Sequence, residues 1–345
     1  MSFITRYGTI FGLVPPTTGR LFWIAPAAEY VVDGRTYRAS DNNDGLAPER
    51  ALRSINQFVT NATANAGDTA ILLQGTHTAD VVQAISKAGL AILGVHSDGG
   101  RLNMQSPKVV ITAEGQGNNI FNVTADDFEL GYVELWPETV MAAIVFGTGR
   151  APAAGVDGFY MHDCVVRLKG PANTSTVGVD FGARSTTLAQ GGMSDGKLAD
   201  TLNLVTAYIE NCVFRSAFLN GPAIIAATCN LYVKGCKFMR DATWATQIWA
   251  ATNASSFIME DCMFAGFGGG ALPIDGTDAN AQHGSFVIQR SSFDPGGLTN
   301  VAKPLDNFTA TSDLGTPTAN YGDAIIGYDV VTMTATGSVP VVLTT

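Results

Sequence analysis

Residues 207–216 read AYIENCVFRS, and the pattern returns as LYVKGCKFMR at 231–240 and as FIMEDCMFAG at 257–266. Each copy has two apolar residues two positions apart, then a polar residue or glycine, a cysteine and, two positions later, a phenylalanine. Weaker copies are FYMHDCVVRL at 159–168, FVIQRSSFDP at 286–295 and FELGYVELWP at 128–137. A motif that recurs at such intervals predicts a repeat architecture.

The spacing of the copies gives the size of the repeat. Their cysteine positions are Val133, Cys164, Cys212, Cys236, Cys262 and Ser291, at intervals of 31, 48, 24, 26 and 29 residues. We interpret the interval of 48 as twice 24, with one degenerate copy inside it. The Gly/Ser/Thr-rich residues 171–203 also fit a single repeat with a long inserted loop, and the strand of that repeat would contain Val177, Val179 and Phe181.

Each copy predicts two strands joined by a sharp corner. Alternating apolar residues before the cysteine indicate a strand with one buried face. The corner residues Asp163, Asn211, Gly235 and Asp261 are of types that tolerate a left-handed backbone. The second strand would bury the cysteine and the residue two positions beyond it, which is Val166, Phe214, Phe238, Phe264 or Phe293.

Stacking of such units at ~4.8 Å makes a parallel β-helix. Its interior would hold Cys164, Cys212, Cys236 and Cys262 in one column. An antiparallel sandwich is the alternative, but sandwiches seldom place the same corner residue types at every interval.

The segments outside the repeat divide the rest of the chain. Residues 1–40 form an N-terminal arm rich in aromatic residues, which must pack on the end of the stack or on another chain. Residues 41–67 hold a turn cluster and a capping helix that starts at Pro48. Residues 68–295 are the β-helix, and residues 296–345 form a strand-rich tail that caps the last coil or pairs with another subunit.

The N-terminal part carries a family resemblance. The order NDG-x-x-PE at 43–49, a short helix, A-GD-T at 66–69 and QGTHT at 74–78 resembles the first coil of right-handed parallel β-helix proteins of the pectin-lyase-like superfamily. The resemblance covers about residues 31–295. It implies an all-β, right-handed, single-stranded β-helix whose helix covers the open end, where sheet edges and core would otherwise be exposed.

A second resemblance concerns function. The run TTGRLFWIAPAAEYVVDGRTYRASDNNDGLAPERAL at 17–52, followed by a β-helix, is similar to structural proteins of tailed bacteriophages.

Charge and composition limit the kinds of partner that the protein is expected to bind. The net charge of −10 without a Lys/Arg cluster excludes nucleic acid as an expected partner. The sequence has no run of 18 apolar residues, so we expect no membrane span, and its start does not read as a signal peptide. Charged residues are only 14%, which indicates that a partner covers some of the surface.

The cysteines are expected to be buried free thiols. They number five, and four of them take equivalent interior positions, where free cysteine behaves as a small hydrophobe. A reduced column suggests folding in a cytoplasm. A metal site is the alternative, but the sequence has no CxxC, and its four histidines, His77, His96, His162 and His283, lie far apart.

Candidate catalytic residues are few. The only Asp-Asp pair, Asp126 and Asp127, precedes a strand and reads as a solvated turn. Asp275 and Asp278 form the best remaining acidic pair, but in a Gly-rich loop, where aspartate is usually a turn residue. Hydrolases of the resembled superfamily carry Gly-His-Gly, whereas His283 follows a glutamine here. Its pectate lyases use an arginine near Arg-x-Pro, and Arg150-Ala151-Pro152 matches this without a cluster of aspartates.

The repeat position two before the cysteine has mixed charge. It holds His162, Glu210, Lys234, Glu260 and Gln289, which we interpret as a solvated outer stripe and not as a site.

The sequence thus predicts a scaffold with no catalytic, cofactor-binding or metal-ligating residues. We expect a homotrimeric structural protein of a phage virion, assembled in the host cytoplasm as a capsid decoration or spike. Its partners would be its own copies and the major capsid or other virion proteins, the latter through residues 1–40, with a host surface glycan as a further ligand. The alternatives are a carbohydrate-active enzyme, such as a lyase, hydrolase or tailspike-like depolymerase, and a glycan-binding module.

Overall fold

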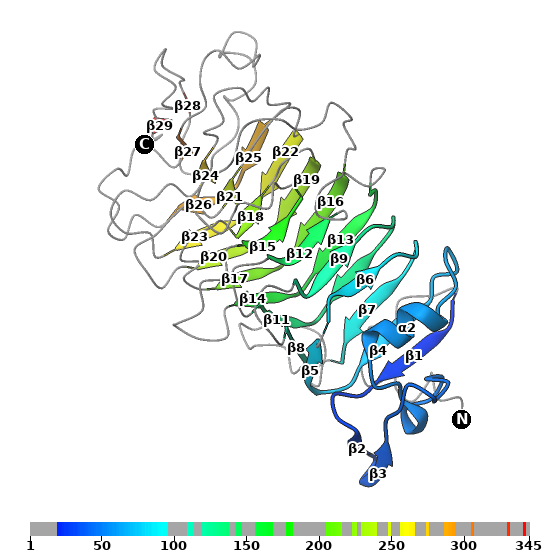
Figure 1. Cartoon of the computed structure of the whole chain (residues 1–345). Helices are drawn as coiled ribbons and strands as arrows, with labels where there is room; N and C mark the ends of the chain where they lie inside the picture. The colour runs from blue at the N-terminus through cyan, green and yellow to red at the C-terminus, as the bar shows by residue number, and fades with distance from the viewer. Residues whose placement is uncertain are drawn as a thin grey trace.

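The molecule is built mainly of parallel β-sheet. The computed structural model describes residues 19–79, 81–95, 109–113, 119–137, 142–146, 156–167, 177–181, 205–215, 223–225, 229–239, 248–249, 256–265, 274–275, 286–293, 305–306, 330–331 and 341–342. Most described strands belong to three long parallel sheets that run side by side along the molecule (Figure 1).

The first of these sheets has nine strands. In spatial order they are β1 (Leu21–Ile24), β4 (Thr69–Leu72), β7 (Ala91–Gly94), β10 (Glu129–Gly131), β13 (Phe159–His162), β16 (Val205–Glu210), β19 (Cys229–Lys234), β22 (Ser256–Glu260) and β25 (Phe286–Gln289).

The second and third sheets have eight strands each. The second contains β5 (Gly75–Ala79), β8 (Val109–Ala113), β11 (Glu134–Trp136), β14 (Val165–Arg167), β17 (Val213–Arg215), β20 (Lys237–Met239), β23 (Met263–Ala265) and β26 (Ser292–Phe293). The third contains β6 (Gln83–Ile85), β9 (Phe121–Val123), β12 (Ala142–Phe146), β15 (Val177–Asp180), β18 (Ile224–Ile225), β21 (Ile248–Trp249), β24 (Ile274–Asp275) and β27 (Leu305–Asp306).

The strand order shows how the chain builds the stack. From β4 onward it visits the first, second and third sheets in turn, and each strand pairs in parallel with the strand three places later. One passage through the three sheets is called a circuit below, and β4 to β27 make eight circuits. The sequence motif accounts for the first two strands of a circuit. The motif does not include the strands of the third sheet, which range from two to five residues.

The corners between the first and second sheets confirm the prediction from the motif. Asp163, Asn211, Gly235 and Asp261 have φ values of 52°, 53°, 62° and 55°. Two corners have residues that the motif does not suggest, because Tyr132 and Arg290 take φ values of 58° and 45°. The left-handed backbone is therefore a property of the corner itself, and the small polar residues and glycine are the types that adopt it most easily.

Two inward columns beside the corners were also predicted correctly. Cys164, Cys212, Cys236 and Cys262 are buried free thiols in successive circuits, and Ser291 continues the column with its Oγ accepting from the Cys262 amide. In the second sheet Val166, Phe214, Phe238 and Phe264 are buried in register. The rings of the three phenylalanines stack with centroids 5.1 Å and 4.6 Å apart.

The interpretation of the 48-residue interval as two repeats is wrong. Strand β13 pairs directly with β16, with Phe159 opposite Ala207, so Cys164 and Cys212 belong to adjacent circuits. The strand predicted around Val177 is β15, and it is the third strand of this one circuit. The rest of 171–203 lies outside the described residues.

A short helix closes the N-terminal end of the core. The segment expected to be one helix from Pro48 is a 3₁₀ turn, Pro48–Arg50, followed by α2 (Ile55–Asn61). Ser54 caps α2 by accepting from the Gln57 amide. Ile55, Phe58 and Val59 are buried, and Phe58 packs edge-on against Phe22 of β1.

Polar residues of the resembled motif tie this end together. Asp68 is 1% exposed, and its carboxylate accepts from the Arg20 amide, the Arg20 guanidinium and the Thr63 amide. Burial works against the charged carboxylate, but these donors outweigh it and lower the pKa of Asp68. Asp41 similarly accepts from the amides of Arg53 and Ser54, which fixes the start of α2.

The structure differs from the assignment of residues 1–40 to an arm outside the repeat. Strand β1 is the first strand of the nine-stranded sheet, and Phe22 and Ile24 lie in the main core. The antiparallel hairpin of β2 (Glu29–Val32) and β3 (Arg35–Arg38) contributes Tyr30 and Val32 to a second, smaller cluster. The expected packing of aromatic residues on the stack is confirmed for this part of the arm, whereas residues 1–18 lie outside the described residues.

The C-terminal part differs from the predicted boundary at 295. Strand β27 pairs with β24, so the third sheet continues into the segment expected to be a tail. Beyond it β28 (Val330–Val331) and β29 (Val341–Val342) form an antiparallel pair. None of the helices among the described residues is both long and apolar enough to span a bilayer.

Candidate functional site

The outer face of the nine-stranded sheet carries two columns of side chains that continue from circuit to circuit. The first column is Glu129, Tyr160, Tyr208, Tyr232 and Ile258. The second is Gly131, His162, Glu210, Lys234 and Glu260. The second column continues to Gln289, which lies opposite Glu260, so the register of the stripe predicted from the motif is confirmed. The first column was not recognised in the sequence.

Carboxylates hold two of the three tyrosines. Tyr160 Oη donates to Glu210 Oε2 at 2.8 Å, and Tyr232 Oη donates to Glu260 Oε2 at 2.8 Å. In each pair the glutamate belongs to the next circuit, so the hydroxyl ties the ring down along the stack. Burial and the hydrogen bond to Glu260 raise the pKa of Tyr232 to about 12. Burial and Glu210 raise the pKa of Tyr160 in the same way.

Tyr208 lies between these two rings and is the most exposed of the three. Its side chain is 45% exposed, and its ring centroid lies 5.8 Å from that of Tyr232. Ile258 continues the column and is 39% exposed. Aromatic and aliphatic surface is therefore presented to solvent on three consecutive strands of one face.

His162 departs from the prediction of a solvated stripe. It is only 7% exposed, because Gly131 leaves room beneath it. A Cβ at Gly131 would come within 2.5 Å of His162 Cε1. The ring stacks on Tyr160 at 4.7 Å and meets the edge of Tyr132 at 5.0 Å.

Both nitrogens of His162 face carboxylates. Nε2 lies 3.0 Å from Glu129 Oε1 and Nδ1 lies 3.0 Å from Asp163 Oδ2. Burial disfavours the charged ring, but the hydrogen bonds to Asp163 and Glu129 outweigh it and raise the pKa of His162 to about 9. The group is therefore an imidazolium at neutral pH that joins two circuits, and it is not poised as a general base.

Ion pairs also fix the far end of the stripe. Arg290 Nε donates to Asp261 Oδ1 at 2.7 Å, and its Nη2 donates to Glu260 Oε2 at 3.2 Å. The same Glu260 oxygen accepts from Tyr232. These contacts orient the carboxylate without burying it.

A second polar cluster lies on the outer face of the second sheet. Glu134 is 1% exposed and is paired with Arg167. The indole Nε1 of Trp136 also donates to Glu134, and the Arg167 guanidinium lies 4.7 Å from the Trp136 ring centroid. Arg167 and Trp136 both bind the Glu134 carboxylate. We therefore interpret this cluster as a buried ion pair with a structural role.

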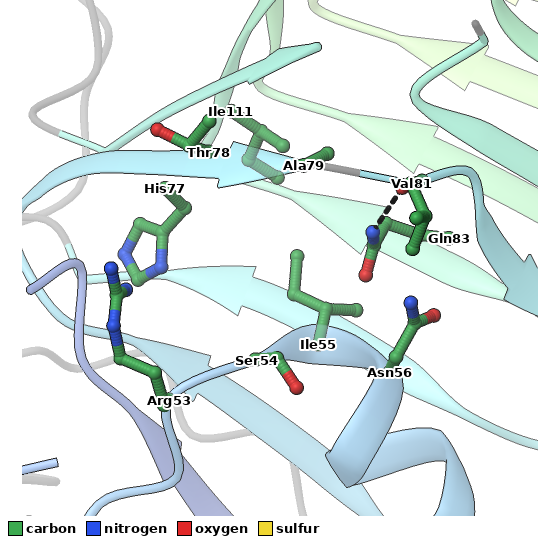
Figure 2. A pocket seen from close by; sticks show the side chains of 10 residues that line it. All are labelled: Arg53, Ser54, Ile55, Asn56, His77, Thr78, Ala79, Val81, Gln83 and Ile111. Carbon is green, nitrogen blue, oxygen red and sulfur yellow. Dashed lines mark hydrogen bonds between the residues drawn. The ribbon is translucent and has the colours of Figure 1, made fainter. Parts of the chain in front are cut away.

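A hollow opens between α2 and the first circuit. It is lined by Arg53, Ser54, Ile55, Asn56, His77, Thr78, Ala79, Val81, Gln83 and Ile111, and it measures about 440 Å³ including the open space at its mouth. Figure 2 shows Ile55 pointing from the start of α2 toward the strand of His77 and Ala79, with Arg53 beside His77 and Gln83 at the other end.

The three polar side chains at the sides of this hollow have structural partners. His77 Nε2 lies 2.8 Å from the Leu73 carbonyl, and Arg53 Nη1 donates to the Pro26 carbonyl. Gln83 donates to Val81. Burial and the nearby Arg53 charge lower the pKa of His77 to about 4, so the ring is neutral and donates from Nε2. The lining residues include no carboxylate, and a glycosidase needs two.

Of the acidic candidates predicted from the sequence, Asp126 and Asp127 lie together in a turn. Asp126 and Asp127 are exposed, and Asp127 takes the left-handed backbone of a turn, with a φ of 54°. Asp126 Oδ1 accepts from the Asp157 amide. The prediction of a turn is confirmed. Asp275 is the last residue of β24 and lies opposite Trp249. Asp278, His283 and Arg150-Ala151-Pro152 lie outside the described residues.

The sulfurs of the cysteine column lie against the backbone. No group of three or more His, Cys, Asp or Glu side chains suited to a metal occurs among the described residues. The sulfurs contact backbone carbonyls, as between Cys164 Sγ and the His162 carbonyl at 3.2 Å. Burial raises the pKa of the Cys212 thiol, which keeps it protonated.

The tyrosine column could have been found in the sequence. Tyr160, Tyr208 and Tyr232 all stand four residues before the motif cysteine, which is an outward position in the same strand. The interaction between His162 and Glu129 had no such signal, because it depends on the register of two circuits whose cysteine positions are 31 residues apart.

Comparison with known proteins identifies no relative. No family model, curated protein or solved structure matches the chain.

Proposed function

We propose that the chain is a right-handed, single-stranded parallel β-helix that serves as a non-enzymatic structural protein of a phage virion. The observation that carries the proposal is the continuous core. A single cluster of buried residues extends from Phe22 of β1 to Phe264 of β23, and α2 covers its N-terminal end. A stack in which each circuit supports the next is a rigid rod, suited to a mechanical role.

The proposed handedness follows from a general rule of parallel sheets. Each strand returns to a parallel partner of the same sheet after a crossover, and such crossovers are right-handed in about 98% of cases. The pectin-lyase-like resemblance of residues 43–78 supports the same architecture.

We further propose a homotrimer, displayed on the capsid shell and assembled in the host cytoplasm. The low content of charged residues, 14%, is in keeping with partly covered faces. The last strands of each sheet also leave edges that neighbouring chains can cover. Residues 1–18 and the tail that contains β28 and β29 supply segments for contacts between subunits and with the particle.

The proposal is tested with purified virions, with the isolated protein and with a variant that lacks the N-terminal residues. Purified virions should contain the chain, and light scattering of the isolated protein should give the mass of a trimer. The truncation must end before Leu21, because Phe22 and Ile24 are core residues. A chain lacking residues 1–18 should keep its circular dichroism and oligomeric mass but lose binding to particles. A monomer in solution, together with absence from virions, would contradict the proposal.

A further inference from the structure

The outer face of the nine-stranded sheet changes character along the stack. Over its first strands the outward residues are Trp23, Ile71 and Leu93, and all three are buried. The β2–β3 hairpin covers them, because its Tyr30 and Val32 belong to the same apolar cluster. The β2–β3 hairpin of the same chain therefore shields the apolar part of this face from solvent.

Beyond the hairpin the column that contains Trp23 turns polar, and the neighbouring column becomes aromatic. Trp23, Ile71 and Leu93 begin the second column, which continues through Gly131 to His162, Glu210, Lys234 and Glu260. The first column presents Tyr208 and Ile258, exposed by 45% and 39%. We call one part of this face the tyrosine stripe. It consists of Tyr160, Tyr208, Tyr232, Glu210 and Glu260.

We propose that the tyrosine stripe binds the chain of a neutral polysaccharide. A sugar ring has an apolar face of C–H groups and a rim of hydroxyls. Tyrosine rings offer flat apolar area at little cost in conformational entropy, and carboxylates accept strong hydrogen bonds from hydroxyls. The stripe supplies tyrosine rings on β13, β16 and β19, and carboxylates beside them on β16 and β22.

The hydrogen bonds of the stripe preorganise it. Tyr160 and Tyr232 are held by Glu210 and Glu260 at 2.8 Å, and Arg290 donates to the same oxygen of Glu260 as Tyr232 does. Each carboxylate retains acceptor capacity beyond these bonds. With strands ~4.8 Å apart, the column from Tyr160 to Tyr232 extends over ~10 Å, which suits an extended ligand lying along the stack.

Charge decides against an acidic polymer. Around the stripe the carboxylates of Glu129, Asp163, Glu210, Glu260 and Asp261 outnumber the cationic groups of His162, Lys234 and Arg290. The whole chain carries a net charge of −10. A polyanion would be repelled both locally and at long range, so the ligand is uncharged. This inference is independent of where the protein sits in a virion.

The experiment measures binding of the full chain to immobilised polysaccharides. The probes are neutral β-1,3-glucan, β-1,4-glucan and α-mannan, and the acidic probe is polygalacturonate. We expect binding to at least one neutral polymer, with little change between low and high salt because no ion pair with the ligand is formed. Tyr208→Ala should weaken it at least about tenfold, as expected for a central aromatic contact, whereas Tyr208→Phe should retain most of it.

Met263→Ala is the matched control. Met263 is 38% exposed but lies in the second sheet, so its loss should leave binding unchanged. Circular dichroism and light scattering of each variant establish that fold and assembly are intact. Binding to none of the neutral polymers, a preference for polygalacturonate, or equal binding by Tyr208→Ala would each overturn the proposal. A change in oligomeric mass on Tyr208→Ala would also overturn it, because the face would then be a subunit contact.

Discussion

Phe238 provides the most direct test of the stacked interior. It is fully buried between Phe214 and Phe264, with ring centroids at 5.1 Å and 4.6 Å and interplanar angles of 5° and 11°. Replacing a buried phenylalanine by alanine typically costs about 3–5 kcal/mol through lost burial and the remaining cavity. Phe238→Ala should therefore fall in the upper part of that range, since the rings above and below keep the cavity open.

Phe238→Leu separates stacking from burial. Leucine keeps most of the buried apolar volume but loses two aromatic pairs, each worth about 0.5–1.5 kcal/mol. The expected cost is thus about 1–3 kcal/mol. Ile258→Ala is the control, because Ile258 lies on the outer face and is 39% exposed. Its loss should cost less than about 1 kcal/mol.

The assay must measure the stability of individual circuits as well as that of the whole protein. Circuits contact mainly their neighbours, so a stack need not unfold in one step. Urea denaturation followed by circular dichroism gives the overall midpoint, and hydrogen exchange reports β17, β20 and β23 separately. For Phe238→Ala the protection of β20 amides should fall by about two to four orders of magnitude, with much less change at β4. Equal effects of Phe238→Ala and Ile258→Ala would refute a continuous aromatic column.

Three further predictions concern the corners, the histidine and the thiols. Gly235→Val should cost about 1–2 kcal/mol in urea denaturation because φ is +62°, whereas Gly235→Asn should stay within about 0.5 kcal/mol, and equal costs would contradict a left-handed corner. The pKa of His162, about 9 in the folded protein, lies above the unfolded value of about 6.5. His162 therefore contributes up to about 3 kcal/mol below pH 6.5, and this is lost as pH rises through 9. The loss should be absent in His162→Gln, and an identical pH profile in that variant would count against the buried imidazolium. Thiol titration should find five free thiols after denaturation without reductant, and Cys236→Ser should change the urea midpoint little, because Ser291 already occupies the same column. A titre of three or one, or a large loss of stability in the serine variant, would argue otherwise.

The repeat could be predicted because its constraints are local. A corner needs a residue that accepts positive φ, and the interior needs an apolar side chain at every second position. Both requirements fall within ten residues, as in the copy that contains Cys212. Tyr132 and Arg290 occupy the same corner and were missed, because neither residue type favours it and only the neighbouring circuits hold it there.

Features that depend on pairing between circuits could not be read from the sequence. Strand β1 looked like part of a non-repeating arm, and only its register with β4, Phe22 opposite Ala70, shows that it extends the sheet. The burial of His162 likewise depends on Gly131 in the circuit before it. The third sheet was missed for a related reason, since strands such as β18 and β21 have two residues each and take their place from their partners.

The inward and outward residues of one strand are under different constraints, and this decides which positions of the sequence can be substituted. In β16 the inward residues Ala207 and Ile209 are buried in the common core, while Tyr208 faces out. Because side chains alternate between the faces, Tyr208 can change without altering core volume, whereas any change at Ile209 affects the circuits on both sides through Met161 and Val233. The corner cannot move either, since a shift by one residue would exchange the faces. A stack of this kind therefore fixes the position of each outward side chain tightly while leaving its identity free. That separation lets the stack acquire a row of tyrosines on one face without loss of the fold.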